Sequence, residues 1–214
     1  MGFVVAIDGP AASGKGTLAA RLGAALGLPV LDSGLLYRAV AAAVLRQGGD
    51  LDDEGTCSNA ARGLDLGALN DPDLRSAAMG EAASRAAAHG RVRETLVRAQ
   101  RDFAAREPGA VLDGRDIGTV IVKDAQAKLF VTASAEARAM RRWRETTNAG
   151  EAVSYEDILA DIRRRDARDE GRAVAPLRPA PDAVLLDTTD LSIDAAFDAA
   201  RRIVEAARAR TGAG

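Results

Sequence analysis

The sequence has 214 residues, of which 47% are hydrophobic and 28% are charged, and its formal net charge is −2. This length suits one α/β domain with inserted segments and allows a substantial buried core. Because the net charge is negative and only 3% of the residues are aromatic, a nucleic-acid-binding module and a basic membrane-binding surface are both disfavoured. Cys57 is the only cysteine, which excludes an internal disulfide and fits a reducing compartment. No apolar run approaches the ~20 residues of a membrane span and no signal peptide is recognisable, so a cytoplasmic protein is expected.

The first predicted elements are a buried strand over residues 4–7, a glycine-bracketed turn, and a helix over residues 16–26. The turn carries the pattern G-x-x-x-x-G-K of a phosphate loop, and the strand before it and the helix after it are the context that this pattern requires. Gly9 and Gly14 let backbone N–H groups converge on an anion, and Lys15 adds a mobile positive charge. A chance turn in a chain rich in glycine and alanine is the alternative. We expect the phosphates of a nucleotide to bind along nine consecutive residues: Gly9, Pro10, Ala11, Ala12, Ser13, Gly14, Lys15, Gly16 and Thr17.

The residue after Lys15 departs from the usual pattern of phosphate loops. That position commonly carries Ser or Thr as a magnesium ligand, whereas this chain has Gly16 followed by Thr17. We therefore expect Mg²⁺ to be held mainly by nucleotide oxygens and water.

A short strand over residues 29–31 and a helix over residues 35–47 follow. Ser33 lies between them, at the carboxyl end of the strand, which is the edge where ligands bind in open α/β sheets. Arg38 falls in the first turns of the helix and is either a ligand-binding residue or an ordinary solvated arginine.

Residues 48–72 are acidic and glycine-containing, and no regular element is predicted there. Helical periodicity returns over residues 77–88 and again from residue 91 to about residue 106, which predicts two helices joined at Gly90. His89, the only histidine, lies at a helix end and suits a cap or the helix dipole better than acid–base catalysis. One histidine and one cysteine are too few for a Cys/His metal site.

A strand over residues 110–113 ends in Asp113, and Gly114 follows it directly. A strand-terminal aspartate in a phosphate-loop protein commonly orders the magnesium ion or its waters, and a plain Asp-Gly turn is the alternative. Asp113 and Thr17 are therefore candidates for magnesium contacts through water.

A strand over residues 127–131 leads to a helix that Ser134 caps and that runs to about Glu145. Near the end of the chain, a strand over residues 183–187 precedes a final helix that begins at Ser192. The first of these helices carries Arg141, Arg142 and Arg144.

Another helix opens at Ser154, with Asp157 in a variant of the capping box. Four residues of its C-terminal half fall within an arc of roughly 100° and place three cations around one carboxylate. They are Arg165, Arg168, Asp169 and Arg172. Ordinary pairing on an exposed helix, for example between Asp161 and Arg165, is the alternative.

The alternation of five strands with helices predicts an α/β fold of the P-loop kinase type, with a five-stranded parallel sheet that is covered on both faces. Two segments depart from the regular pattern at the strand edge that carries the phosphate loop: residues 34–92 and residues 146–176. We expect them to be inserted lobes on the core of a single domain, which comprises residues 1–33, 93–145 and 177–214.

A phosphate loop without a catalytic histidine or a nucleophilic cysteine points to phosphoryl transfer, in which the protein positions two substrates and neutralises charge. Arginines from the inserted lobes fit this chemistry because a guanidinium binds phosphate in bidentate fashion. Closure of the lobes excludes the water that would hydrolyse the donor. The residues therefore predict a small-molecule kinase, and by themselves they do not name its acceptor.

Six separated motifs follow one another along the chain. They are I-D-G-P-A-A-S-G-K-G-T (7–17), L-D-S-G-x-x-Y-R (31–38), R-V-R-E (91–94), D-G-R-D-I-G-T (113–119), R-D-A-R-D-E-G-R-A-V-A-P-L (165–177) and L-D-T-T-x-L-S-I (186–193). In this order they resemble the motifs of the bacterial cytidylate kinases, a branch of the nucleoside monophosphate kinase family. The resemblance implies transfer of the γ-phosphate of ATP to CMP or dCMP with Mg²⁺, UMP being a poorer acceptor. A monomer that binds no nucleic acid and no membrane is expected.

The resemblance also implies which residues bind the acceptor. Ser84, Arg93 and Asp116 read the cytosine, and a carboxylate such as Asp116 can accept a hydrogen bond from the exocyclic amine that uracil lacks. Arg38 and Arg115 hold the acceptor phosphate. The sugar side is contacted by Ser33, Arg165 and Asp169, and the base site is braced by Arg172.

On the donor side, the resemblance implies that Arg141 and Arg168 approach the ATP phosphates. With Lys15 and Arg115 they form the expected catalytic set. Residues 34–92 then correspond to the segment that binds the nucleoside monophosphate, and residues 146–176 correspond to the lid. Monophosphate kinases also carry glycine directly after the lysine, so the hydroxyl that follows it is expected to contact the donor phosphates first.

One stretch departs from the family. The bacterial members carry a β-rich insertion after the acceptor helix, and residues 64–76 are too few for the full set of strands. How the acceptor segment is braced, and how far it closes, are left open.

Other functions remain to be weighed against this one. The nearest is another kinase of the same fold, acting on AMP, UMP or shikimate. A nucleotide-dependent switch is disfavoured because the chain lacks the guanine-reading pattern N-K-x-D. The preference between CMP and dCMP and the oligomeric state are not determined by the sequence.

Overall fold

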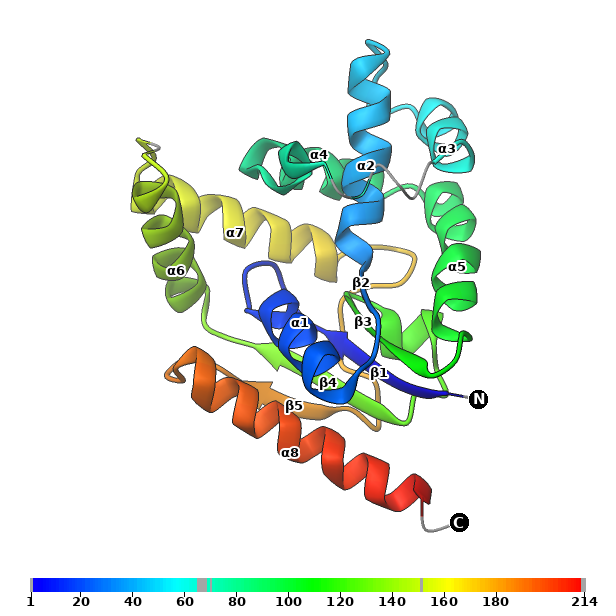
Figure 1. Ribbon diagram of the computed structural model, residues 1–214. Helices are drawn as coiled ribbons and strands as arrows, with labels where there is room; N and C mark the ends of the chain where they lie inside the picture. Colours follow the sequence, from blue (N-terminus) through cyan, green and yellow to red (C-terminus); the bar gives the residue numbers. More distant parts are fainter. Residues whose placement is uncertain (1, 65–68, 70, 151, 213–214) are drawn as a thin grey trace. The chain divides into compact units, whose positions relative to one another are not determined.

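The structure is a computed structural model that describes residues 2–64, 69, 71–150 and 152–212 (Figure 1). The chain divides into two compact units. The core unit comprises Met1–Val30 and Ala104–Gly214, and the helical unit comprises Leu31–Phe103. The chain therefore leaves the core unit once and returns to it once.

A parallel sheet organises the core unit. In the described part of the chain its strands are β1 (Phe3–Asp8), β2 (Val30–Asp32), β3 (Gly109–Gly114), β4 (Ala127–Thr132) and β5 (Val184–Asp187), in the spatial order β2-β3-β1-β4-β5. The central strand β1 pairs in parallel with β3 and β4, so Asp8 lies beside Gly114 and Phe130. The predicted five-stranded parallel sheet is confirmed. Since the strands are parallel, the loops that follow β1, β3, β4 and β5 leave the sheet from the same edge.

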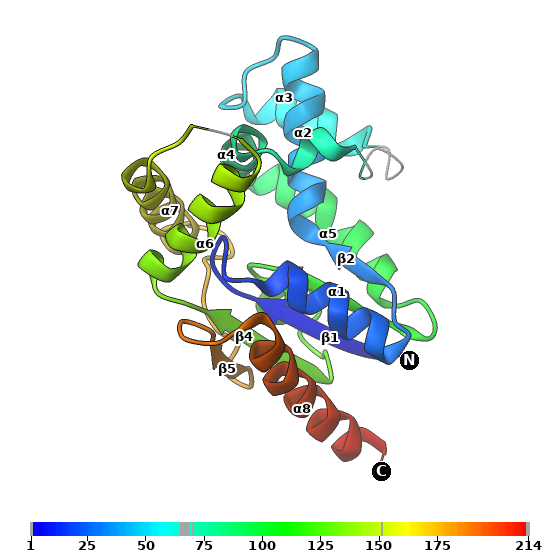
Figure 2. The same cartoon turned by 60° about the vertical axis from the view of Figure 1, so that its left-hand side comes forward.

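Helices and one short π-helix complete the core unit (Figure 2). They are α1 (Lys15–Leu26), η3 (Ile117–Ile121), α6 (Ala135–Asn148), α7 (Tyr155–Glu170) and α8 (Ile193–Gly212). No helix in the described ranges is both long enough and apolar enough to cross a membrane.

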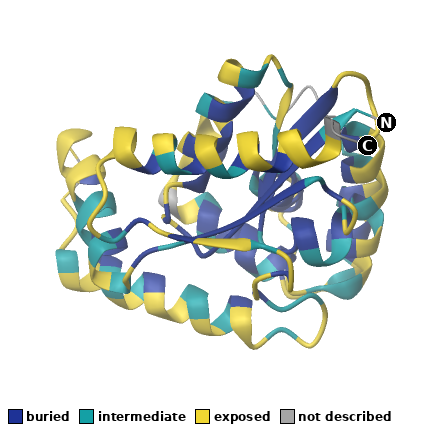
Figure 3. Cartoon of the chain, turned by 90° about the horizontal axis from the view of Figure 1, so that it is seen from below, coloured by how far each residue is buried: buried dark blue, intermediate teal, exposed yellow. Residues whose placement is uncertain are grey.

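The main apolar core lies between the sheet and helices α1 and α8 (Figure 3). Leu22 of α1 and Val204 of α8 are fully buried there, together with Ile7 of β1. Ala6 and Leu112, which point to the opposite face of the sheet, are buried as well. Parallel strands that are buried on both faces appear in a sequence as continuous apolar runs, which is why these strands could be predicted.

Several helix ends carry the predicted caps. Ser134 Oγ accepts a hydrogen bond from the N–H of Ala137 at 3.1 Å, and Ser154 Oγ accepts one from the N–H of Asp157 at 3.0 Å. The Ser154 hydroxyl also donates to the Asp157 carboxylate at 2.6 Å. Helix α1 ends at Gly27, whose φ of 68° is the left-handed conformation that glycine favours at this position.

The helical unit contains α2 (Ser33–Arg46), α3 (Glu54–Arg62), the 3₁₀ turn η2 (Pro72–Arg75), α4 (Ala77–Ala86) and α5 (Gly90–Ala104), of which the last residue belongs to the core unit. One apolar cluster joins α2, α3, α4 and α5, and Val40, Cys57, Ala83 and Val92 contribute to it. The helical unit therefore has a core of its own. The helices predicted on either side of Gly90 are confirmed.

The prediction of no regular element over residues 48–72 is wrong, because α3 lies within this range. Asp53 begins the helix by accepting hydrogen bonds from the N–H groups of Gly55 and Thr56. Weak helix formers conceal the periodicity of this stretch, and burial of Cys57 in the helical unit supplies the stabilisation that propensity does not. The shortened insertion expected at residues 64–76 lies partly outside the described residues.

Candidate active site

The phosphate loop connects β1 to α1, and its backbone requires glycine at two positions. Gly9 has a φ of 154°, and a Cβ atom there would lie 2.0 Å from the carbonyl oxygen of Val131. Gly14 has a φ of 85° and directly precedes the first residue of α1. The loop therefore turns straight into a helix N-terminus, whose unpaired N–H groups attract anions. The predicted succession of strand, loop and helix is confirmed.

Lys15 folds back over this loop. It is only 8% exposed, and its Nζ atom donates a hydrogen bond to the carbonyl oxygen of Pro10 at 3.0 Å. Ser13 Oγ is buried and has no hydrogen-bond partner among the described residues. A buried cation and a buried hydroxyl within one loop are groups that a bound phosphate can satisfy.

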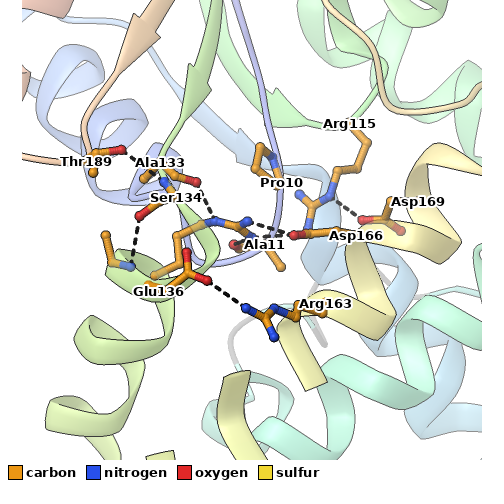
Figure 4. A network of polar contacts seen from close by, with 12 residues as sticks. Pro10, Ala11, Arg115, Ala133, Ser134, Glu136, Arg163, Asp166, Asp169 and Thr189 are labelled. Atoms are coloured by element: carbon orange, nitrogen blue, oxygen red, sulfur yellow. Dashed lines mark hydrogen bonds and ion pairs between the residues drawn. The ribbon is translucent and has the colours of Figure 1, made fainter. Parts of the chain in front are cut away.

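Arg138 is a site residue that the sequence patterns do not reveal. From α6 its Nε donates to the carbonyl oxygen of Ala133 at 2.9 Å, and its Nη1 donates to the carbonyl oxygen of Ala11 at 3.1 Å. The same guanidinium forms a bidentate ion pair with Asp166 of α7, at 3.0 and 2.7 Å (Figure 4). It thereby joins the phosphate loop, the end of β4 and α7. The sequence offers one clue to this role: Arg138 directly precedes Ala139, which lies on the apolar face of α6.

Replacing Arg138 with methionine is expected to lower the free energy of unfolding by roughly 3 kcal/mol, because the buried guanidinium is lost and the Asp166 carboxylate, only 16% exposed, is left without its ion-pair partner. Chemical denaturation followed by circular dichroism measures the difference. Arg164→Met is the matched control, since Arg164 pairs with Asp161 at 2.8 Å while its side chain is 63% exposed. The control should cost less than about 1 kcal/mol. Equal losses in the two variants would contradict the importance of the Arg138 pair.

The cluster predicted on one face of a helix gathers around Asp169, but Arg172 is not part of that helix, because α7 ends at Glu170. Arg115 Nε donates to Asp169 Oδ2 at 2.8 Å (Figure 4). Arg172 pairs with the other carboxylate oxygen. Burial raises the pKa of Asp169, but the attraction of Arg115, Arg172 and Arg165 outweighs burial and holds this pKa below its ordinary value. Asp169 therefore stays ionised and connects the loop after β3 with α7. Asp161, the alternative partner of Arg165, forms an ion pair with Arg164.

Arg141 lies against the segment that follows β5. Its Nη1 donates to Thr188 Oγ1 at 3.2 Å, and its Nη2 donates to the carbonyl oxygen of Thr189 at 3.3 Å. The Thr188 hydroxyl in turn lies 3.4 Å from the carbonyl oxygen of Ser13 in the phosphate loop. Arg141 is thus connected to the loop through one threonine.

Asp8, the last residue of β1, is a second residue that the sequence patterns do not reveal. Its carboxylate accepts hydrogen bonds from the N–H groups of Ile117 at 2.7 Å and Gly118 at 2.8 Å. Burial raises the pKa of Asp8 to about 6, against the two N–H groups and Lys15, which lower it, while the neighbouring Asp116 raises it further. The sequence offers one clue to this role: Asp8 is a carboxylate at the end of an apolar strand, directly before Gly9, the first glycine of the phosphate loop.

Asp113 is the penultimate residue of β3, one position before the end of the strand, and is 4% exposed. Its Oδ2 atom lies 3.8 Å from the position of a Cβ atom built on Gly16, so the carboxylate faces the first turn of α1. Across the described residues, no three His, Cys, Asp or Glu side chains gather closely enough to hold a metal ion. One carboxylate beside the loop fits a magnesium ion that nucleotide oxygens and water hold.

Arg38 of α2 organises part of the helical unit. Its Nη1 donates to the carbonyl oxygens of Leu74 at 2.5 Å and Ser76 at 3.0 Å, which lie at the end of η2 and at the start of α4. Arg38 is therefore held by backbone carbonyls and is not simply a solvated arginine.

The other candidates in the helical unit are buried. Arg93 is 4% exposed, and its guanidinium carbon lies 5.6 Å from the centre of the Tyr37 ring. Ser84 Oγ is buried without a hydrogen-bond partner in the described ranges, and Ser33 begins α2 at 4% exposure. A buried hydroxyl and a buried guanidinium are groups through which a polar base can be recognised.

His89 makes a contact that the predicted cap or dipole role does not include. Its Nε2 lies 2.8 Å from the carbonyl oxygen of Leu51, so the ring joins the α4–α5 junction to the segment before α3. This contact is structural.

The predicted site residues fall into two sets, one in each unit. The core unit carries Lys15, Thr17, Asp113, Arg115, Asp116, Arg141, Arg165, Arg168, Asp169 and Arg172. The helical unit carries Ser33, Arg38, Ser84 and Arg93. Within the core unit the structure brings Arg115 and Arg172 into direct contact with Asp169.

Comparisons with known proteins identify the family to which this chain belongs. The family profile described as cytidylate kinase matches residues 5–206. A cytidylate kinase of Caulobacter vibrioides strain NA1000 is 62% identical over 210 residues, which cover 98% of this chain and 99% of that protein. A cytidylate kinase of Xanthobacter autotrophicus is 64% identical over 207 residues, which cover 97% of this chain and 99% of that one. Among solved structures, an uncharacterized protein from Eubacterium ventriosum shares the fold at a TM-score of 0.53 and 15% identity, with 95% of this chain and 98% of that chain covered. The chain belongs to the cytidylate kinase family.

Proposed function

We propose that this chain transfers the γ-phosphate of ATP to CMP and dCMP by direct in-line phosphoryl transfer and forms CDP and dCDP for pyrimidine nucleotide metabolism. The observation that carries the proposal is the phosphate loop, with buried Lys15, in a chain of the cytidylate kinase family. Phosphoryl transfer requires positioning and charge neutralisation more than covalent chemistry, and arginines and one lysine supply both.

On the donor side, the backbone N–H groups of residues 9–17 and the Lys15 ammonium bind the ATP phosphates. Lys15 exchanges the Pro10 carbonyl for a phosphate oxygen, which is a stronger, charge-assisted partner. Arg141 and Arg168 neutralise charge that develops during transfer. Mg²⁺ bound with ATP would neutralise phosphate charge, and Asp113 and Thr17 are the residues that would hold it through water.

On the acceptor side, Arg38 and Arg115 hold the phosphate of CMP. Ser84, Arg93 and Asp116 read the base. The sugar is contacted by Ser33, Arg165 and Asp169, and the base site is braced by Arg172. The ion pairs of Asp169 with Arg115 and Arg172 support this assignment, because they keep the cations ordered before an anion arrives.

The organisation of the chain is part of the same proposal. Residues 34–92 form the segment that binds the nucleoside monophosphate and residues 146–176 form the lid, on the core of residues 1–33, 93–145 and 177–214. The enzyme acts as a monomer in the cytoplasm. The single, buried Cys57 supports a reducing compartment, because no disulfide can form within the chain.

A steady-state assay with ATP and Mg²⁺ tests the proposal directly. We expect CMP and dCMP to be the best acceptors, UMP to be poorer, and AMP and shikimate to be turned over very slowly. Turnover of AMP equal to or above that of CMP would refute the proposal. ATP hydrolysis that does not depend on any acceptor would favour a nucleotide switch instead.

A further inference from the structure

The Asp8 carboxylate caps a helix that belongs to a different segment of the chain. Asp8 ends β1 and is 3% exposed. Its Oδ1 accepts the N–H of Ile117 and its Oδ2 accepts the N–H of Gly118, at 2.7 and 2.8 Å. These are the first two N–H groups of η3, which have no acceptor within the helix itself. The carboxylate thus performs from β1 the task that an N-cap side chain ordinarily performs locally.

The two residues before η3 are Arg115 and Asp116, which form the whole connection between β3 and η3. Asp8 holds both ends of this connection, because its backbone lies beside Gly114 in the sheet while its carboxylate binds the start of η3. The carbonyl oxygen of Asp116 accepts hydrogen bonds from the N–H groups of Val120 and Ile121, at 2.9 and 3.1 Å. Three interactions therefore fix the backbone that carries Arg115 and Asp116: the strand pairing of Gly114, the Asp8 cap on η3, and the hydrogen bonds to the Asp116 carbonyl oxygen.

Space around the Asp8 carboxylate is limited. A Cβ atom on Gly118 would lie 3.4 Å from Asp8 Oδ2 and 3.2 Å from the Cδ atom of Lys128. A side chain on Gly118 would therefore be in contact with both the Asp8 carboxylate and the Lys128 side chain. The Lys128 ammonium is directed elsewhere, since it pairs with Asp182 at 2.7 Å.

Two charged groups face Asp8 from the neighbouring elements. Asp116 lies close enough to raise its pKa, and Lys15 at the start of α1 lowers it. The N–H groups of Ile117 and Gly118 and the Lys15 ammonium offset the repulsion between the Asp8 and Asp116 carboxylates. Asp8 is thereby coupled to the proposed base-reading carboxylate and to the phosphate-binding lysine.

We propose that Asp8 is a positioning residue for acceptor recognition: by capping η3 it fixes the backbone of Arg115 and Asp116 and so sets the selectivity for cytosine over uracil. This inference rests on the proposed function, in which Asp116 reads the base and Arg115 holds the acceptor phosphate. The ionised carboxylate accepts both N–H groups, whereas the amide of asparagine offers one oxygen and an NH₂ group that cannot accept. Asp8→Asn therefore retains the shape and loses one of the two hydrogen bonds.

The first test compares steady-state kinetics of the wild type and Asp8→Asn with CMP, UMP and ATP as the varied substrates. We expect kcat/KM for CMP to fall at least about tenfold and the ratio of kcat/KM for CMP to that for UMP to fall about fivefold, as misplaced contact groups do. KM for ATP should change less than about threefold, because the phosphate loop keeps its own glycines. A lower melting temperature with an unchanged CMP-to-UMP ratio would show a merely structural role and overturn the proposal.

Asp53→Asn is the matched control for this test. Asp53 also accepts two backbone N–H groups at the start of a helix, those of Gly55 and Thr56, at 3.1 and 2.9 Å. Its helix, α3, carries none of the proposed site residues, so the CMP-to-UMP ratio should stay within about twofold of the wild type. An equal fall in this ratio for Asp53→Asn would also overturn the proposal.

A second test uses the wild type and remains decisive if Asp8→Asn does not fold. The phosphate of CMP itself ionises near pH 6, so a pH profile of the rate would mix the two groups. We therefore choose the amide chemical shifts of Ile117 and Gly118 in the nucleotide-free protein, measured by NMR between pH 4 and 7.5. Both should titrate together with a midpoint near the Asp8 pKa of about 6. Asp116→Asn should lower this midpoint, because it removes the like charge that raises the pKa.

The absence of a common transition at the two amides, in titrations extended below the ordinary aspartate pKa of about 3.9, would overturn the proposal even in an active enzyme. Failure of the proposed function looks different, since the wild type would then show no CMP-dependent turnover while both amides still titrate. The two failures are therefore distinguishable.

Discussion

Lys15→Met is expected to lower kcat by roughly 10²–10³-fold, the usual loss when one preorganised group that stabilises transition-state charge is removed. The side chain is buried over the loop at the Pro10 carbonyl, so the ammonium is already in place when ATP binds. Methionine has a similar length and no charge. CMP affinity should survive, because the residues proposed to bind CMP do not include Lys15.

Steady-state assays give kcat for this variant, and isothermal titration calorimetry gives the affinity for CMP. Lys123→Met is the matched control, since Lys123 is an exposed lysine of the same unit and should leave kcat unchanged. Loss of CMP binding in Lys15→Met would contradict the assignment of Lys15 to the donor phosphates.

Asp116→Ala is expected to lower kcat/KM for CMP by roughly 5- to 150-fold, which corresponds to about 1–3 kcal/mol for one base-reading contact. UMP turnover should change far less, because uracil carries a carbonyl oxygen where cytosine carries the amine. The substitution also removes a like charge beside Asp8, which lowers the pKa of Asp8 and keeps that carboxylate ionised at neutral pH. The cap on η3 should therefore persist in the variant.

Competition between CMP and UMP in one reaction measures the effect as a ratio that does not depend on the active fraction of the enzyme. Asp124→Ala, at an exposed acid shortly after η3, is the control and should leave the ratio unchanged. A parallel loss of activity on both acceptors would refute the role of Asp116 as a reader of the amine.

Most elements of the fold could be predicted because their signals are local. The three central strands of the sheet are buried runs such as residues 110–113, and caps such as Ser134 and Ser154 use hydrogen bonds to residues three positions away. α3 could not be predicted, because its formation depends on the burial of Cys57 in the helical unit and not on helix propensity. The π-helix η3 was missed for the same kind of reason, since its first N–H groups are satisfied by Asp8.

The candidate site divides in the same way. The phosphate loop could be predicted because glycine conformations and one lysine suffice to define it. Helical spacing could place Arg165 and Asp169 on one face of α7. It does not account for Arg172, which lies beyond the end of the helix, nor for the contact with Arg115, which is 54 positions away from Asp169. Helical spacing reports which residues share a face, and it says nothing about what lies opposite that face.

The amino-acid sequence by itself determined the parallel sheet, the phosphate loop and a set of charged residues suited to phosphoryl transfer, because short-range patterns carry this information. Only the tertiary structure decided that Arg138 holds the Ala11 carbonyl from 127 positions away and that Asp8 caps η3 from 109 positions away. Burial and distant partners determine whether such a group is paired and where its pKa lies, and neither is encoded in the neighbouring residues. The roles of Asp8 and Arg138 therefore became visible only once the chain was folded.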